Sequence, residues 1–210
     1  GKPANRTFFI LNGGELTICD CSEHETGKIV AQGTNKENGG NIMVGSKSTL
    51  NLQGGTICGG SVKDGMFGGN INVVGNASGN GVLNMTGGCI TGGSADVNAG
   101  GNVYVSGTLN ISGGQIDGFV AVAKGTLSQV NISGKAQILG EENGLYLPAN
   151  ELININGLLE QTAKIYIVLE SGSGVFTQST SAYKGTTFFI ILQVFCKNIF
   201  VFSGISLVLR

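Results

Sequence analysis

GGNVYVSGTLNISGGQI, residues 100–116, contains three short runs in which apolar residues alternate with other residues. The runs are VYV, TLNI and QI, and Ser-Gly or Gly-Gly residues separate them. Alternation with a period of two is typical of β-strands, and glycine pairs are typical of tight turns. The stretch therefore predicts three short strands joined by turns, which together make one coil of a solenoid.

The same blocks recur along the chain in the same order, which is the signature of a repeat architecture. The Leu-Asn-apolar block recurs at 50–52, 83–85 and 109–111, with looser copies at 16–18, 130–132 and 153–155. The Gly-Gly-x-Ile block recurs at 54–57, 87–90 and 113–116, and Gly-Gly-Asn with its strand at 39–44, 68–73 and 100–105. The spacing between copies varies, so we expect the longer coils to carry a loop between their second and third strands.

Alternation places one set of apolar side chains on the inner side of every coil, where they stack on the next coil. One coil cannot bury this face alone, so stacking has to create the core. We predict an all-β fold, a right-handed parallel β-helix of about six three-strand coils; the hand follows from the preference for right-handed crossovers. The predicted domains are the β-helix coils, residues 1–158, and a strand-rich capping segment, residues 159–210.

Composition limits the function classes. Glycine accounts for 37 of the 210 residues, and charged residues make up 12% with a net charge of -1. The chain has no basic cluster to neutralise phosphates, which excludes nucleic acid as a partner. Five cysteines follow no zinc-ligand spacing, and we expect no cofactor.

The tail, residues 188–210, is far more apolar than the rest of the chain. Phe, Ile and Val dominate it, which favours capping strands. A stretch of this length also suits a transmembrane helix, although Gln193, Lys197 and Asn198 lie inside it. A third interpretation is an unrelated tail from a shifted reading frame. Membrane contact is expected only if the tail is an anchor.

The motifs GGNIMV, GGNINV, GGNVYVSGTLNISGG and LTICDCSEHETGKIV resemble the Gly-rich β-helix regions of adhesin-like surface proteins from gut Firmicutes. The resemblance covers roughly residues 7–180, including AKIYIVLESGSGVFT near its end. It implies a bacterial cell-surface or secreted module that is structural or adhesive rather than enzymatic, with glycans or host and cell-surface components as partners. The alternative is a carbohydrate-active β-helix enzyme, a polysaccharide lyase or glycoside hydrolase, because these coils occur in such enzymes too.

One strand of each coil, preceded by Gly-Gly-Asn in three of the coils, projects one column of side chains outward. The column contains Phe9, Met43, Asn72, Tyr104, Ala121 and Tyr146. Aromatic rings beside amides suit sugars, which stack on aromatic faces and hydrogen-bond through hydroxyls. We therefore predict Tyr104, Tyr146 and Asn72 as ligand-binding residues. The alternative is that a loop or the C-terminal segment covers this face.

Two carboxylates stand at matching places in neighbouring coils. Asp64 and Asp96 each lie four residues before a Gly-Gly-Asn block, which would bring them about 5 Å apart and allow them to share a Ca²⁺ ion. Asn35 holds the same place one coil earlier, so these three residues also suit a plain polar turn. The only histidine, His24, has no partner histidine and is expected in a solvated loop. No catalytic residue is predicted.

A second outward column is nearly uniform. It contains Thr17, Asn51, Asn84, Asn110, Asn131 and Asn154. Stacked amides hydrogen-bond to one another along such a column. We expect it to be structural, a ladder that ties each coil to the next.

Overall fold

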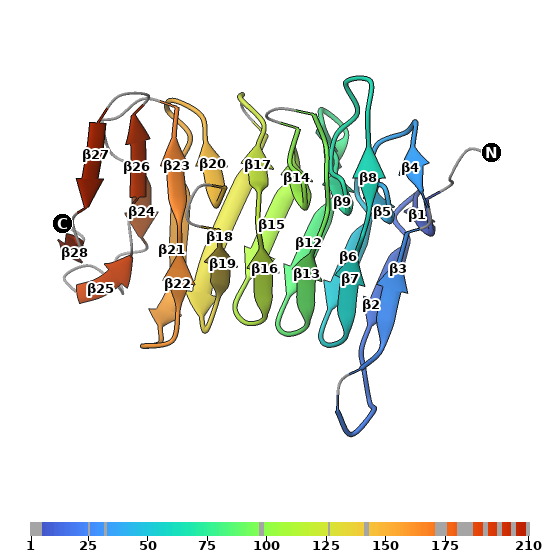
Figure 1. The fold of residues 1–210 in the computed structure, drawn as a ribbon, viewed down its shortest axis with the longest axis horizontal. Coiled ribbons are helices and arrows are strands. Elements are labelled where there is room, and N and C mark those ends of the chain that lie inside the picture. Colours follow the sequence, from blue (N-terminus) through green and yellow to red (C-terminus); the bar gives the residue numbers. More distant parts are fainter. Residues whose placement is uncertain are drawn as a thin grey trace.

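The strands stack into a parallel β-helix in the computed structural model (Figure 1). The structure describes residues 6–24, 26–31, 33–96, 99–125, 127–140, 143–170, 176–179, 187–190, 193–196, 199–202 and 205–208. No helix occurs among them, and three parallel sheets form the walls of the stack. The all-β parallel β-helix prediction is confirmed.

Each wall takes one strand from each successive coil. Sheet 1 contains β1 (Phe8–Ile10), β5 (Ile42–Val44), β9 (Ile71–Val73), β14 (Val103–Val105), β17 (Val120–Val122), β20 (Leu145–Leu147) and β23 (Ile167–Leu169). Sheet 2 contains β2 (Glu15–Ile18), β6 (Thr49–Leu52), β12 (Val82–Met85), β15 (Thr108–Ile111), β18 (Gln129–Gly134), β21 (Ile153–Leu159) and β24 (Thr177–Ser179). Sheet 3 contains β3 (Lys28–Val30), β7 (Thr56–Cys58), β13 (Cys89–Thr91), β16 (Gln115–Asp117), β19 (Gln137–Leu139) and β22 (Lys164–Ile165).

The pairing register matches the sequence repeat residue for residue. Leu83 pairs with Leu50 on one side and with Leu109 on the other, and Ile90 pairs with Ile57 and Ile116. Six coils within the described residues supply a strand to all three sheets, and β23 and β24 begin a seventh. The repeat blocks are therefore the structural coils.

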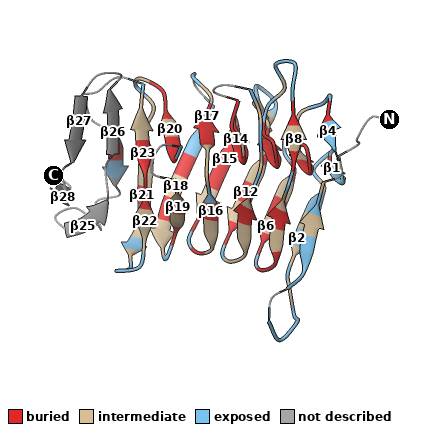
Figure 2. Ribbon diagram, in the orientation of Figure 1, coloured by how far each residue is buried: buried red, intermediate tan, exposed pale blue. Residues whose placement is uncertain are grey.

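The core is a column of apolar side chains inside the three walls. Residues of the central coils, such as Leu83, Ile90 and Ile116, are fully buried. The first coil has a neighbour on one side only, so its inward-facing Leu16, Ile18 and Ile29 are half-buried. Figure 2 shows this change from exposed to buried strands between the N-terminal end and the middle of the stack.

A second asparagine column lies inside the β-helix, at the turn from sheet 3 into sheet 1. Asn41, Asn70 and Asn102, the last residues of the Gly-Gly-Asn blocks, are buried. Asn70 Nδ2 donates to Asn102 Oδ1 (2.7 Å) and to the Thr91 carbonyl (2.8 Å), while Asn70 Oδ1 accepts from Asn41 Nδ2 (2.8 Å). The side chains of this inner asparagine column hydrogen-bond backbone N–H and carbonyl groups of a sharp turn, such as the Thr91 carbonyl, that are not paired within a sheet.

Glycine is required where this column passes close to the backbone. The Gly60 N–H donates to Asn70 Oδ1 (2.8 Å), and a Cβ at Gly60 would lie 2.6 Å from that same oxygen. A Cβ at Gly93 would lie 2.2 Å from the carbonyl oxygen of Gly101. A side chain at either position would displace the inner column, because real Cβ atoms do not approach oxygen so closely.

The predicted loops, which follow the Gly-Gly-x-Ile strand and precede the Gly-Gly-Asn block, occur in the early coils between sheet 3 and sheet 1. There, β4 (Thr34–Asn35) pairs with β8 (Ser61–Val62), and Ser61 forms an isolated bridge with Ser94. A hairpin of β10 (Gly75–Asn76) and β11 (Gly79–Asn80) adds a further excursion in the third coil. The later coils lack these excursions and are shorter.

The parallel stack continues past residue 158, where we predicted the capping segment to begin, because β22, β23 and β24 extend the three sheets. The pairing becomes antiparallel in β25 (Thr187–Ile190) with β28 (Ile205–Val208), and in β26 (Gln193–Cys196) with β27 (Ile199–Phe202). Figure 1 shows these strands at the C-terminal end of the stack, with β26 next to β23. Among the described residues, no helix is long and apolar enough to span a bilayer.

Candidate binding face

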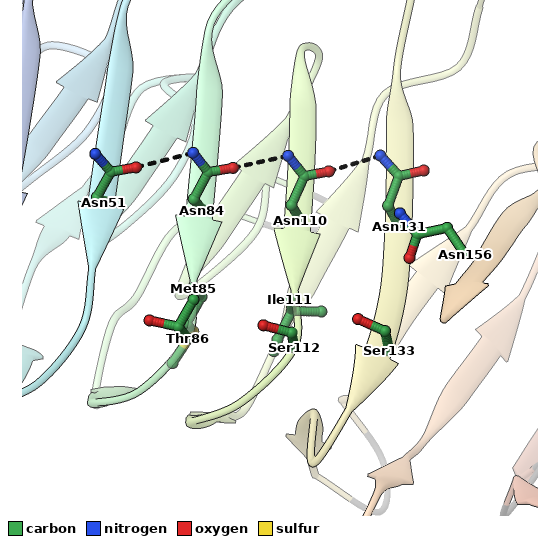
Figure 3. Close-up of a pocket in the computed structure, with 10 residues that line it drawn as sticks. All are labelled: Asn51, Asn84, Met85, Thr86, Asn110, Ile111, Ser112, Asn131, Ser133 and Asn156. Carbon is green, nitrogen blue, oxygen red and sulfur yellow. Dashed lines mark hydrogen bonds between the residues drawn. The ribbon is translucent and has the colours of Figure 1, made fainter. Parts of the chain in front are cut away.

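The outer face of sheet 2 carries the predicted ladder of amides. Asn84 Nδ2 donates to Asn51 Oδ1 (2.8 Å), Asn110 to Asn84 (2.7 Å) and Asn131 to Asn110 (2.6 Å), as Figure 3 shows. Asn154 donates in turn to Asn131 (2.8 Å), and Gln178 donates to Asn154. The prediction of a coil-to-coil ladder is confirmed. We call Asn51, Asn84, Asn110, Asn131 and Asn154 the outer asparagine ladder.

The ladder has a direction. Every amide N–H in it points toward the N-terminal end, and there Asn51 Nδ2 donates to Glu15 Oε1 (2.6 Å) and to Thr17 Oγ1 (3.3 Å). A carboxylate therefore accepts the last donor of the chain of amides, where charge strengthens the hydrogen bond. The ladder ends in a charge-assisted contact rather than in an unpaired N–H.

The ladder does not exhaust the hydrogen-bonding capacity of its members. An asparagine amide has two N–H donors and two acceptor lone pairs. Asn84 uses one donor toward Asn51 and one lone pair toward Asn110. One donor and one acceptor therefore remain on Asn84, and the same holds for Asn110 and Asn131. Asn51 keeps only an acceptor, because it donates to both Glu15 and Thr17. These side chains are half-buried rather than covered. The outer face thus offers paired donors and acceptors at the spacing of the coils, about 4.8 Å.

A groove of about 400 Å³ runs beside the ladder. Its second wall is a row of hydroxyls (Figure 3). Thr86 and Ser112 directly follow β12 and β15, and Ser133 lies near the end of β18. Within the described part of the chain, these three hydroxyls form no hydrogen bond with the protein. All ten residues that line the groove are uncharged. The groove is therefore a neutral polar channel across several coils.

An irregular strand closes one end of the groove. Ile132 pairs with Ile155 but Gly134 pairs with Leu159, so β21 uses four residues where β18 uses two. The additional residues turn Asn156 toward Asn131 (Figure 3) and leave Leu158 59% exposed. Bulges of this kind commonly redirect a side chain toward a site. The insertion gives the groove one further amide, that of Asn156, at this end.

The predicted aromatic face lies on sheet 1. Tyr104 pairs with Asn72 and with Ala121, and Ala121 pairs with Tyr146, so the column is in the predicted register. Both tyrosines are half-buried. Burial raises the pKa of both phenols, and the nearby Glu170 carboxylate raises that of Tyr146 further.

Aromatic side chains from the turns lie over these tyrosines. The Phe67 ring stacks on Tyr104 with 4.3 Å between centroids, and Phe119 lies 6.3 Å from Tyr146 in a tilted arrangement. Asn72 is only 3% exposed, and its Oδ1 has no hydrogen-bond partner. The three predicted ligand-binding residues share one face, but neighbouring side chains already occupy a large part of it.

The two predicted calcium ligands lie in stacked turns. Asp96 Oδ2 accepts a hydrogen bond from the Gly65 N–H (2.9 Å), directly after Asp64, whose φ is 61°. Asn35 does not share their position, because it pairs with Val62 and is buried. Across the described ranges, no group of three His, Cys, Asp or Glu side chains gathers as a metal site would require.

Several carboxylates close turns. Asp20 accepts hydrogen bonds from the N–H groups of Ser22 (2.9 Å) and Gly27 (2.6 Å), and contacts with Ser22 and Gly27 lower its pKa. Glu170 accepts from the Ala149 N–H (2.8 Å) and from Lys124 Nζ (3.2 Å), which lower its pKa in that order. Both carboxylates therefore hold turns together by accepting hydrogen bonds from backbone N–H groups.

Sequence reasoning missed the hydroxyl row, Asn156 and the inner asparagine column. The signal for the first was present, since each hydroxyl stands two residues after a ladder asparagine. The inner column was marked by the asparagine that ends each Gly-Gly-Asn block. Asn156 carried no such signal, because the insertion in β21 breaks the repeat. Comparison with protein-family models, with curated proteins and with solved structures gives no significant match, so the functional argument rests on this chain's own residues.

Proposed function

We propose that this chain is a non-enzymatic structural and adhesive module of a bacterial cell-surface or secreted protein, and that it binds glycans on the outside of its β-helix. The observation that carries the proposal is the neutral groove beside the outer asparagine ladder, where spare amide and hydroxyl groups recur from coil to coil. Sugar hydroxyls both donate and accept hydrogen bonds, so they match a surface that offers both.

The architecture supports the structural half of the proposal. The coils are tied to one another by three sheet ladders, by the apolar core and by the outer asparagine ladder. The inner asparagine column adds hydrogen bonds between the coils that contain Asn41, Asn70 and Asn102. Such a stack grows along one axis and keeps its outer faces at constant register, which suits a rod that displays a repeated surface.

A glycan array, run in parallel with lyase and hydrolase assays, tests the proposal. We expect binding to neutral oligosaccharides and no cleavage of any glycan that binds. The groove is open to solvent and contributes no charged contact, so the expected dissociation constants lie between about 1 μM and 1 mM. Turnover of a bound glycan would contradict the proposal in favour of a carbohydrate-active enzyme. Absence of binding to every glycan would contradict the adhesive role.

A further inference from the structure

The geometry points to one ligand class and one orientation: the groove on sheet 2 holds a single extended chain of uncharged sugars, lying along the β-helix axis, with its end against Asn156. This inference rests on the proposed function and assigns it to the outer asparagine ladder and the hydroxyl row, rather than to Tyr104 and Tyr146.

The direction of the chain follows from the placement of the polar groups. The ladder amides and the three hydroxyls form two parallel rows, and both rows run across the strands, along the stacking axis (Figure 3). Members of a row stand one coil apart, about 4.8 Å. A pyranose ring is about as long as one coil is high, so a linear oligosaccharide along the axis meets a new amide and a new hydroxyl at each sugar. A chain across the axis would meet only one coil.

The neutrality of the ligand follows from charge and from hydrogen-bonding capacity. No lining residue carries a charge. A phosphate, sulfate or carboxylate offers acceptors alone and would leave the free lone pair of each amide facing another acceptor. A cationic ligand would leave the free N–H groups unmatched in the same way. A hydroxyl satisfies both groups, and unpaired polar groups at a contact weaken binding.

The length of the ligand follows from the number of coils whose side chains line the groove. Ladder amides line the groove from Asn51 to Asn131, over four coils, and the β21 insertion with Asn156 closes it beyond them. Three intervals of about 4.8 Å give a groove of roughly 14 Å. The groove therefore accommodates about three to four sugars.

Ser112→Lys is the variant that tests this site. The Ser112 side chain is exposed and forms no hydrogen bond within the described residues, so a lysine there fills the groove without altering the ladder. Thr86→Lys makes the same change one coil earlier and serves as the second variant. The matched control is Thr56→Lys, an outward position on sheet 3. Circular dichroism and the melting temperature confirm that each variant is folded.

The probes are linear oligomers of glucose, mannose and xylose from two to eight units, oligogalacturonate as an anionic chain, and an uncharged Ser-Gly peptide. Isothermal titration measures each one against the complete chain. For a neutral oligomer that binds, we expect affinity to rise with length up to about four sugars and then level off. Ser112→Lys or Thr86→Lys should weaken it about tenfold or more, and Thr56→Lys should not.

The other outcomes would contradict the groove, the neutral-sugar assignment or the proposed function. Unchanged affinity in both lysine variants, with loss in Tyr104→Ala plus Tyr146→Ala, would overturn the groove and leave the adhesive function intact. Preference for oligogalacturonate or for the peptide would overturn the neutral-sugar assignment. Failure of every neutral oligomer to bind, while other glycans bind on the array, would overturn the groove alone. Absence of binding on the array as well would overturn the proposed function.

Discussion

Ile90→Asp is expected to unfold the central coils of the β-helix. The Ile90 side chain is fully buried and stacks between Ile57 and Ile116. A carboxylate in that place has no partner, and both neighbouring coils lose apolar contacts. The expected loss in the free energy of unfolding is more than about 4 kcal/mol. A thermal melt followed by circular dichroism should show a fall in Tm of roughly 10 °C or more.

The control for this prediction is Thr56→Asp. Thr56 lies on the same sheet one coil earlier but faces outward, and it pairs with Lys28 on its other side. The same carboxylate there stays in water, so its effect should remain within about 0.5 kcal/mol. If Ile90→Asp melted as the unmodified protein does, or if both variants lost stability equally, the inward and outward assignments would be wrong.

Asn70→Ala is expected to have the second largest effect. The Asn70 amide has four hydrogen-bond partners: Asn41 Nδ2, the Gly60 N–H, the Thr91 carbonyl and Asn102 Oδ1. An alanine removes the hydrogen bond that each of these four groups makes with the Asn70 amide. Water from the surface cannot replace these hydrogen bonds, because Asn70 is fully buried. Each buried group left unpaired costs about 1–3 kcal/mol. The expected destabilisation is therefore about 3 kcal/mol or more.

Asn110→Ala on the outer asparagine ladder provides the comparison. Asn110 has two ladder partners, Asn84 and Asn131, and all three amides are partly open to water. Water replaces the lost hydrogen bonds, so the expected loss is about 1 kcal/mol. Urea denaturation of the two variants in parallel measures the difference. Equal losses would mean that the inner asparagine column stabilises the turn no more than the surface ladder does.

Most of the fold could be predicted from the sequence because a solenoid repeats its own register. Once the Leu-Asn-apolar blocks are aligned, the partners of Leu83 and Asn84 in the next coil follow by counting. Alternation then separates inward from outward side chains, and the buried core and the outer ladder both agree with it. The repeat therefore carried long-range pairing information that an ordinary sequence lacks.

The sites were harder to predict, because alternation gives the direction of a side chain and not what covers it. Tyr104 and Asn72 point outward as expected, yet Phe67, from a turn outside the repeat, stacks on Tyr104, and Asn72 is buried. The end wall of the groove depends on two additional residues in β21, which interrupt the repeat. Asn35 aligned with Asp64 when counted from the glycines, but the pairing of β4 with β8 places it opposite Val62. The positions of side chains in turns and insertions could not be predicted from the spacing of the repeat.

The side-chain amide NMR signals of the outer asparagine ladder report directly on binding at the proposed atoms. The protein labelled with ¹⁵N is titrated with a linear neutral hexasaccharide from the panel above. A sugar chain in the groove should give saturable shifts of the Nδ2 signals of Asn84, Asn110 and Asn131, with Asn41 and Asn70 of the inner column unchanged. Shifts confined to the backbone signals around Tyr104 and Tyr146, with the ladder amides unmoved at saturation, would contradict binding in the groove.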